Sequence, residues 1–444
     1  SWLLQLTAIF SVAGVNAESY VHSGWRPTTD SCSSQAPNLT KYGLEVHLAR
    51  TITVFPPAKA LANAGHAFAF KNGAMNVLTR YGANKSFAVR SMDGGQTWQD
   101  LPQQAAPFEE RSASEVRTEA LQRSSGEVIW FSGFTSHARD GASGGQDFMR
   151  QPNGSVQVEL LRSNDFGLTQ THELALLWLP ASLDLRNLQH AVMVELPNKS
   201  LISITYAHWT GIDGFAFYNG QGMPKDRTFV MRSDDDGRNW RYLSTVAYDP
   251  SNNTEACVLS SDGEGTPPCA VIEGFNEPWL TVTPHPTAAE GVALVALMRS
   301  GGSLAVQAGV VAGPLYRSIS VDGGLTWGIV QPVANRGVAP TVAMTKSKVM
   351  IASYGRPGNF LMFSIDGGVS FFGHWCYKGA AVGSQYDGSE YDSIALVPSS
   401  TADDDTEQVM VTYANCTSTQ SCSAMASFVR IKRLPLAQPE AAYV

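Results

Sequence analysis

Arginine, glutamate and tyrosine side chains in the second half of the chain have the types needed for chemistry on an anionic ligand. A guanidinium, as on Arg299 or Arg356, binds a carboxylate through paired, charge-assisted hydrogen bonds. Tyr391 carries a phenol, whose ordinary pKa is about 10, and Glu277 carries a carboxylate. The fold must bring these residues together for that chemistry to occur.

A second group of polar and aromatic residues comprises His190, Tyr206 and His208. These residues either belong to ordinary strands and loops or line a central cleft together with the arginine, glutamate and tyrosine residues named above. No Cys-x-x-Cys or His-x-x-x-His spacing of metal ligands appears in the sequence. The sequence therefore predicts neither a metal site nor a cofactor.

Five copies of a short pattern, Ser-x-Asp-x-Gly-x-Thr-Trp or a close variant, indicate how the fold is organised. Their aspartates are 72, 70, 87 and 44 residues apart, a spacing typical of repeated supersecondary units. We expect the Ser and Asp side chains to hydrogen-bond a turn, the Gly to supply a positive φ, and the closing Trp or Phe to pack against the next strand. Strand-like runs precede most copies. The copies begin at Ser91, Ser163, Ser233, Ser320 and Ser364.

The composition favours an all-β fold built from many short strands. Short apolar or alternating runs end in clusters of Gly, Pro, Asn and Asp, and no long segment has helical periodicity. The repeats occupy about residues 45 to 430, enough chain for about six four-stranded units. We therefore predict a six-bladed β-propeller closed by a terminal strand that completes the last blade. A pair of β-sandwiches would explain the hairpins but not their repetition.

The beginning of the chain and its sequons predict export. Residues 1–17 resemble the remnant of a signal peptide, with an apolar stretch from Trp2 to Val15 followed by small residues. Residues 18–444 are then expected to form a single propeller domain, secreted or in the lumen of the secretory pathway, with no membrane span. Six Asn-x-Ser/Thr sequons agree with this compartment. They are Asn38, Asn84, Asn153, Asn198, Asn252 and Asn415.

Six cysteines, an even number, also suit an oxidising compartment. Cys257 with Cys269 and Cys416 with Cys422 are near enough in sequence to staple loops, which leaves Cys32 and Cys376 to pin the closure of the ring. Six cysteines allow 15 pairings, so other connectivities stay open. The net charge of −8 argues against nucleic acid or an anionic membrane as a partner.

The repeats resemble the Asp boxes, or BNR repeats, of the sialidase (neuraminidase) superfamily. Four segments between and after the repeats are also similar to that family, and the resemblance covers nearly all of the chain after residue 17. It implies a six-bladed propeller that binds glycans or glycoconjugates. The four segments are Phe275-Asn-Glu-Pro278, Ala296-Leu-Met-Arg-Ser300, Gly355-Arg-Pro-Gly-Asn359 and Glu390-Tyr-Asp-Ser393.

The resemblance also implies roles for individual residues. Arg299 and Arg356 match two arginines that hold the carboxylate of a sialic acid, and Arg50 is the match for a third. Tyr391 matches the nucleophile, and Glu277 matches the glutamate that takes its proton. A phenol suits this role because a carboxylate nucleophile would repel the carboxylate of the substrate. The alternative for Arg299 and Arg356 is a structural ion pair at a blade seam, and for Glu277 a turn cap.

The chain departs from the family at the general acid, which is an Asp between the first Arg and the first Asp box. From Thr51 to Met92 this chain has no Asp or Glu. General acid catalysis contributes roughly 10²–10⁴ in rate, so a substitute is expected. The candidate substitutes are His66, Glu115 and Glu119.

Three functions follow as hypotheses. The first is a secreted exo-glycosidase that hydrolyses terminal sialic acid or a related acidic sugar, with retention and a Tyr nucleophile. The second is another carbohydrate enzyme on the same propeller, such as a uronate glycosidase or a lyase with His190 or Tyr206 as base. The third is a non-catalytic glycan-binding propeller. The oligomeric state is left open.

Overall fold

The computed structural model describes most of the chain between residues 32 and 435. No helix of the described residues is long and apolar enough to cross a membrane. The predicted leader, Cys257, Cys269 and Asn84 lie outside the described residues. The described ranges are 32–55, 63–81, 85–101, 120–132, 150–209, 211, 213–218, 221–252, 273–301, 313–335, 337–355, 358–379, 392–398, 405–418 and 421–435.

The described chain is all-β, as predicted, apart from a 3₁₀ turn at Thr40–Tyr42. Four sheets have four strands each, and a larger sheet of eight consists of two antiparallel sets of four joined by a parallel pairing of β15 (Asn239–Ala247) with β9 (Thr171–Trp178). A hairpin of two strands, β12 (Phe215–Tyr218) and β13 (Gln221–Pro224), stands apart from them.

The six sets of four strands, each given from its first strand to its outer strand, have the following bounds. The first three sets are β2 (Asn63–Ala69), β3 (Met75–Tyr81), β4 (Lys85–Ser91) and β5 (Gln99–Asp100); β6 (Leu121–Gln122), β7 (Val128–Ser132), β8 (Val156–Ser163) and β9 (Thr171–Trp178); and β10 (Leu183–Glu195), β11 (Leu201–Trp209), β14 (Asp226–Ser233) and β15 (Asn239–Ala247). The others are β16 (Asn276–Pro284), β17 (Val292–Arg299), β18 (Leu315–Ser320) and β19 (Gln331–Ala334); β20 (Val338–Met344), β21 (Met350–Gly355), β22 (Asn359–Ser364) and β23 (Phe372–Lys378); and β24 (Ser393–Val397), β25 (Thr406–Ser418), β26 (Ser421–Arg433) and β1 (Leu44–Phe55).

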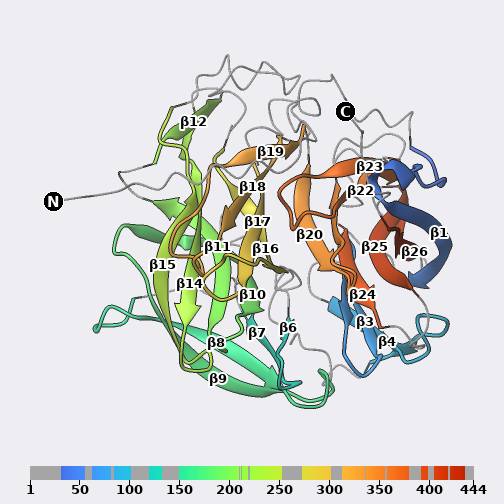
Figure 1. Ribbon diagram of the computed structural model, residues 1–444. Helices are drawn as coiled ribbons and strands as arrows, with labels where there is room; N and C mark the ends of the chain where they lie inside the picture. The colour runs from blue at the N-terminus through green and yellow to red at the C-terminus, as the bar shows by residue number, and fades with distance from the viewer. Residues whose placement is uncertain are drawn as a thin grey trace, which may run out of the picture.

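The first strands of the six sets pack against one another in a series. The series of packed neighbours runs β6, β10, β16, β20, β24 and β2. Figure 1 shows the sheets following one another around the molecule in chain order, with blue β1 beside red β26. The pairing of β1 with β26 confirms that a strand from the N-terminal side completes the last set.

The five Ser-x-Asp repeats form the turns that the sequence predicts. In the first, Ser91 Oγ donates to Asp93 Oδ1 and accepts from Gly95 N at 2.8 Å each, while Thr97 N donates to Asp93 Oδ1 at 2.9 Å. The hydrogen bonds from Thr97 and Ser91 hold the pKa of the Asp93 carboxyl well below its ordinary value. The same pattern recurs in the other four copies.

Close packing explains why the repeat requires its glycine. Gly95 has φ of +82°, and a Cβ placed there would lie 2.3 Å from the Phe428 ring. The aromatic residues that close the repeats are packed as expected: Trp240 is fully buried against Phe131 and donates from its indole to Gly237 O at 2.8 Å. Each turn therefore joins its own sheet to a neighbouring one.

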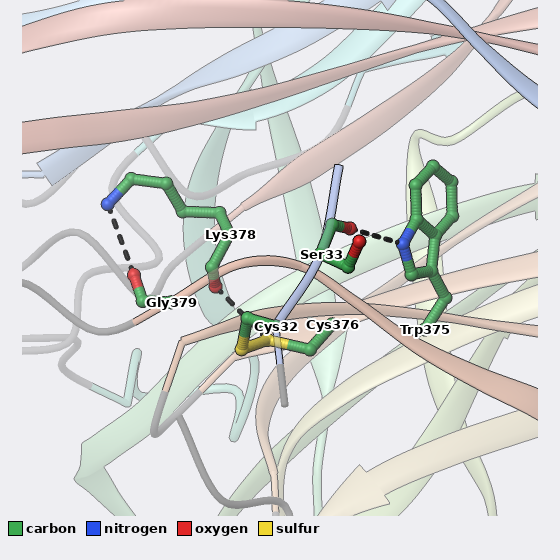
Figure 2. The surroundings of a disulfide bond; sticks show 6 residues. All are labelled: Cys32, Ser33, Trp375, Cys376, Lys378 and Gly379. Carbon is green, nitrogen blue, oxygen red and sulfur yellow. Dashed lines mark hydrogen bonds between the residues drawn. A yellow bond between two sulfur atoms is a disulfide. The ribbon is translucent and has the colours of Figure 1, made fainter. Parts of the chain in front are cut away.

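The predicted disulfide between Cys32 and Cys376 is confirmed. It ties the segment before β1 to β23, across a sequence separation of 344 residues. Figure 2 shows the bond beside Trp375, whose indole donates to Ser33 O at 2.8 Å. Ser33 N also donates to Cys376 O at 3.0 Å, so the segment is held by both covalent and hydrogen bonds.

The structure describes some of the other cysteines and sequons on which the secretory hypothesis depends. Cys416 and Cys422 are directly opposite each other in the β25–β26 hairpin, and their bond stays a prediction. The sequon asparagines within the described ranges are all exposed, as a glycan would require. They are Asn38, Asn153, Asn198, Asn252 and Asn415.

The strand directions give the sheets two distinct ends. All five repeat turns follow third strands, namely β4, β8, β14, β18 and β22, so they gather at one end. Because neighbouring strands within a set are antiparallel, the opposite end is made by the beginnings of first and third strands and the ends of second strands. Glu277 is the second residue of β16 and Arg299 is the last residue of β17, which places both at the end opposite the repeat turns.

Candidate functional site

Four of the first strands have the same irregularity near the end of the sheets that lies opposite the repeat turns. In each case, three steps along the first strand are paired with only two steps along the second strand, which is the pattern of a β-bulge. The paired positions that flank the bulges are Asn63/Arg80 and His66/Leu78, Gln189/Tyr206 and Val192/Ile204, Asn276/Arg299 and Trp279/Leu297, and Val338/Gly355 and Thr341/Ser353. In three of them the residue after the first pair has positive φ: His190 (54°), Glu277 (39°) and Ala339 (43°). Such backbone is costly outside glycine and is concentrated at functional sites.

Glu277 and Arg299 form a buried ion pair at the third of these bulges. Arg299 Nη1 lies 2.8 Å from Glu277 Oε1, and each side chain is only 7% exposed. The other carboxylate oxygen, Oε2, accepts from Ala339 N at 3.2 Å. The two residues that the resemblance places in one site are therefore in contact, and β20 helps to hold their carboxylate.

A chain of buried polar groups continues from this pair into the neighbouring set. Asn276 Nδ2 donates to Asp226 Oδ2 at 2.8 Å, and Asp226 Oδ1 lies 2.9 Å from His208 Nε2. Arg227 Nε donates to Asp213 Oδ1 at 3.0 Å, and burial raises the pKa of the Asp213 carboxyl despite that partner. His208 thus belongs to a structural network that fixes the start of β14 against β16.

His190 and Tyr206 lie on β10 and β11 beside this network. Both are buried, with ring centroids 5.6 Å apart. The Tyr206 hydroxyl donates to Gln189 Oε1. Tyr206 faces Gln189 as Arg299 faces Asn276, so this pair of strands repeats the construction that holds Glu277 and Arg299.

Four predicted site residues lie outside the described residues: Glu115, Glu119, Arg356 and Tyr391. The residues next to two of them are placed. Gly355, before Arg356, ends β21 opposite Val338, and Asp392 and Ser393, after Tyr391, lead into β24. Both segments therefore enter or leave the end of the sheets at which Glu277 and Arg299 lie.

His66, a candidate substitute acid, lies on β2 and is half-buried. The amide of the next residue, Ala67, donates to Ser393 Oγ at 3.1 Å. This bond brings the strand of His66 to the segment that follows Tyr391.

Arg50 lies at the other end of the molecule. It is on β1, the outer strand of its set, where its guanidinium stacks 4.2 Å from the Phe428 ring centroid. Arg50 Nη2 donates to Gly94 O at 2.5 Å, inside the first repeat turn. The structure therefore does not bring Arg50 to Arg299, and its contacts are those of a residue that stabilises the closure of β1 on the first repeat.

Arg80 was not identified by the sequence analysis, but its position in the strand register corresponds to that of Arg299, whereas the position of Arg50 does not. Arg80 lies one residue before the end of β3 and pairs with Asn63, beside a bulge of the same kind as the one beside the Asn276–Arg299 pair. The signal in the sequence is Arg80-Tyr81 at the end of an apolar run, which is too common to identify a site. Strand register supplies the missing information.

Asp392, next to Tyr391, is a buried carboxyl with an unusual titration. Burial raises its pKa to about 7, although hydrogen bonds from Tyr377, Ser353 and Asn359 oppose that shift. Tyr377 Oη donates to Asp392 Oδ2 at 2.8 Å, and Ser353 Oγ donates to Oδ1 at 3.2 Å. The carboxyl thus anchors the end of the Tyr391 segment to β21 and β23.

The titration of Asp392 predicts a pH dependence of stability. Because its pKa is about 7 in the folded protein and about 4 in an unfolded chain, the folded state binds more protons between these values. Its contribution to the free energy of unfolding is therefore fully present below about pH 4 and is lost as pH rises through about 7. We expect wild-type protein to lose stability relative to Asp392→Asn over this range, measured as the difference in urea midpoint. A difference that does not change with pH would contradict the assignment.

Within the described ranges no group of three or more His, Cys, Asp or Glu residues has the arrangement of a metal site. The candidate site consists of the Glu277–Arg299 pair, the bulges around it and the neighbouring polar groups.

Comparison with known proteins shows the fold and little beyond it. No protein-family model matches the sequence, and no curated protein matches it. A protein of unknown function from Dyadobacter fermentans is 17% identical, with a TM-score of 0.57, over 87% of this chain and 99% of that one. This similarity shows that the two chains share a fold.

Two further solved structures have weaker similarity to this chain, and their names are those of a sialidase and a trans-sialidase. The Hadza microbial sialidase Hz136 is 13% identical, with a TM-score of 0.46, over 82% of this chain and 65% of that one. The intramolecular trans-sialidase from Ruminococcus gnavus is 15% identical, with a TM-score of 0.45, over 88% of this chain and 99% of that one. These similarities are too weak to assign an activity or a site residue to this chain.

Proposed function

We propose that the protein is an extracellular exo-glycosidase that hydrolyses a terminal sialic acid or a related acidic sugar, on a six-bladed propeller of sialidase type. The observation that carries the proposal is the buried Glu277–Arg299 pair at the strand ends opposite the repeat turns. The six sets of four strands and the closing pairing of β1 with β26 support the propeller. The resemblance of the sequence supplies the class of substrate.

In this proposal the guanidinium groups of Arg299 and Arg356 bind the carboxylate of the sugar. Arg299 is already held by Glu277, so its orientation is set before the substrate arrives, which lowers the entropy cost of binding. Arg80 is the third guanidinium in place of Arg50, because its register matches that of Arg299. Three groups around one carboxylate would fix the anomeric carbon.

Tyr391 is then the nucleophile and Glu277 its base. The phenolate attacks the anomeric carbon, the leaving-group oxygen departs with a proton, and water later releases the sugar with retained configuration. The hydrogen bonds of Asp392 and Ser393 support the proposal because they fix the chain just after Tyr391.

The test is release of sialic acid from a fluorogenic sialoside and from a sialylated glycan by purified protein. We expect turnover by the wild-type protein and none by Tyr391→Phe, which keeps the ring but lacks the attacking oxygen. Thermal unfolding of the two proteins is the control for folding. A sugar product with a double bond that absorbs in the ultraviolet would instead indicate a lyase and would refute hydrolysis.

A further inference from the structure

Three neighbouring first strands present their bulge residues side by side. β10, β16 and β20 pack against one another in this order, and their bulges carry His190, Glu277 and Ala339 at the same offset. The contact of Ala339 N with Glu277 Oε2 shows that two of these bulges meet. The repeated construction puts the bulge of His190 next to that of Glu277 on its other side.

We propose that His190 is the proton donor of the hydrolysis, in the place of the aspartate that the sequence lacks. This inference rests on the proposed function. His190 is 8% exposed and occupies on β10 the position that Glu277 occupies on β16. Its imidazole lies beside the Tyr206 ring, which the bond to Gln189 holds in place. Bulges that aim a side chain from a strained backbone are characteristic of active sites.

The reaction consumes only the glycoside and one water molecule. The phenol of Tyr391 gives its proton to Glu277 and its oxygen bonds to the anomeric carbon, while the bond to the leaving oxygen breaks and that oxygen takes a proton from the His190 imidazolium. Water then attacks the anomeric carbon and returns a proton to His190. The bond to Tyr391 breaks, and Glu277 returns the phenol proton.

Two other histidines of the described ranges, His208 and His66, are less suited to the role. His208 is paired with Asp226, which also holds Asn276, so it serves the network that positions β16. His66 lies on β2 at the position after the bulge, where β10 has Val192 and β16 has Trp279. His190 alone among the three has the register position of Glu277.

The test compares two substrates in His190→Asn. Asparagine tolerates the left-handed backbone of His190 and cannot serve as the acid. For a sialylated disaccharide, whose leaving group is poor, we expect kcat to fall by about 10²–10⁴. For an aryl sialoside with a good leaving group, which needs little protonation, we expect a fall of less than about tenfold. His190→Gly, which also accepts positive φ, is the second variant, and exposed His172→Asn is the control.

The outcomes are distinct. Equal loss on both substrates, with an active wild-type protein, would overturn the assignment of His190 as acid but leave the proposed function standing. No turnover of either sialoside by the wild-type protein would overturn the proposed function and this inference together. Selective loss on the poor leaving group in either variant would support the inference.

Discussion

Arg299→Lys is expected to lower kcat/KM for a sialoside by about 10–100-fold. The lysine keeps a positive charge beside Glu277, but it cannot offer paired N–H donors to a carboxylate, and one hydrogen bond to a charged group contributes roughly 1.5–3 kcal/mol. The measurement is steady-state kinetics on a fluorogenic sialoside, together with the thermal midpoint of unfolding.

The contrast with a purely structural ion pair makes this prediction decisive. Glu277→Gln leaves the Arg299 guanidinium buried without its charged partner, a change that typically costs about 3–5 kcal/mol of stability. Arg299→Lys keeps the pair and should cost much less. If Arg299→Lys had unchanged kcat/KM, the pair would serve only to hold β16 against β17.

Removal of the Cys32–Cys376 disulfide is expected to lower the free energy of unfolding by about 2–5 kcal/mol. The bond closes a very long loop, and the entropy that a crosslink removes from the unfolded chain grows with loop length. The measurement is the denaturant midpoint of Cys32→Ser/Cys376→Ser under non-reducing conditions. Because Cys376 lies on β23, an outer strand, and neither cysteine is part of the proposed site, we expect kcat to be unchanged where the variant is folded.

The matched control is Cys416→Ser/Cys422→Ser. These cysteines face each other in the β25–β26 hairpin, so a bond between them would close only a short loop. We expect its removal to cost less than removal of the long-range bond. The reverse order would show that the segment before β1 is held mainly by the hydrogen bonds of Ser33 and Trp375.

Features that are local in the chain could be predicted from the sequence. The turn of Ser91 to Thr97 depends on residues at most four positions apart, and its hydrogen bonds match the expected ones. The strand-like runs before the repeats, such as 229–232 and 360–363, lie within β14 and β22. The all-β class follows from the same short-range patterns.

Features that depend on strand register could not be predicted. Arg50 was assigned to the site by its order in the chain, which does not reveal that β1 is an outer strand with Arg50 at the repeat end. The proposed roles of Arg80 and His190 depend on bulges that give them the register positions of Arg299 and Glu277. A one-residue difference in register would reverse the face of each side chain, and no pattern in the sequence fixes it.

Four site residues remain predictions of the sequence, since they lie outside the described residues: Glu115, Glu119, Arg356 and Tyr391. The support for Tyr391 comes from its neighbours. Asp392 and Ser393 are each fixed by hydrogen bonds to other sets of strands, at the end where the Glu277–Arg299 pair lies.

The central claim is that an acidic sugar binds beside Glu277 and Arg299 and is attacked by Tyr391. The most direct measurement is mass spectrometry of the protein after incubation with a fluorinated sialosyl fluoride, whose fluorine slows breakdown of a covalent intermediate. We predict one sugar adduct, on the peptide that contains Tyr391, and no adduct in Tyr391→Phe. An adduct on a different residue, or an unmodified protein that still releases sialic acid from a sialoside, would contradict the account.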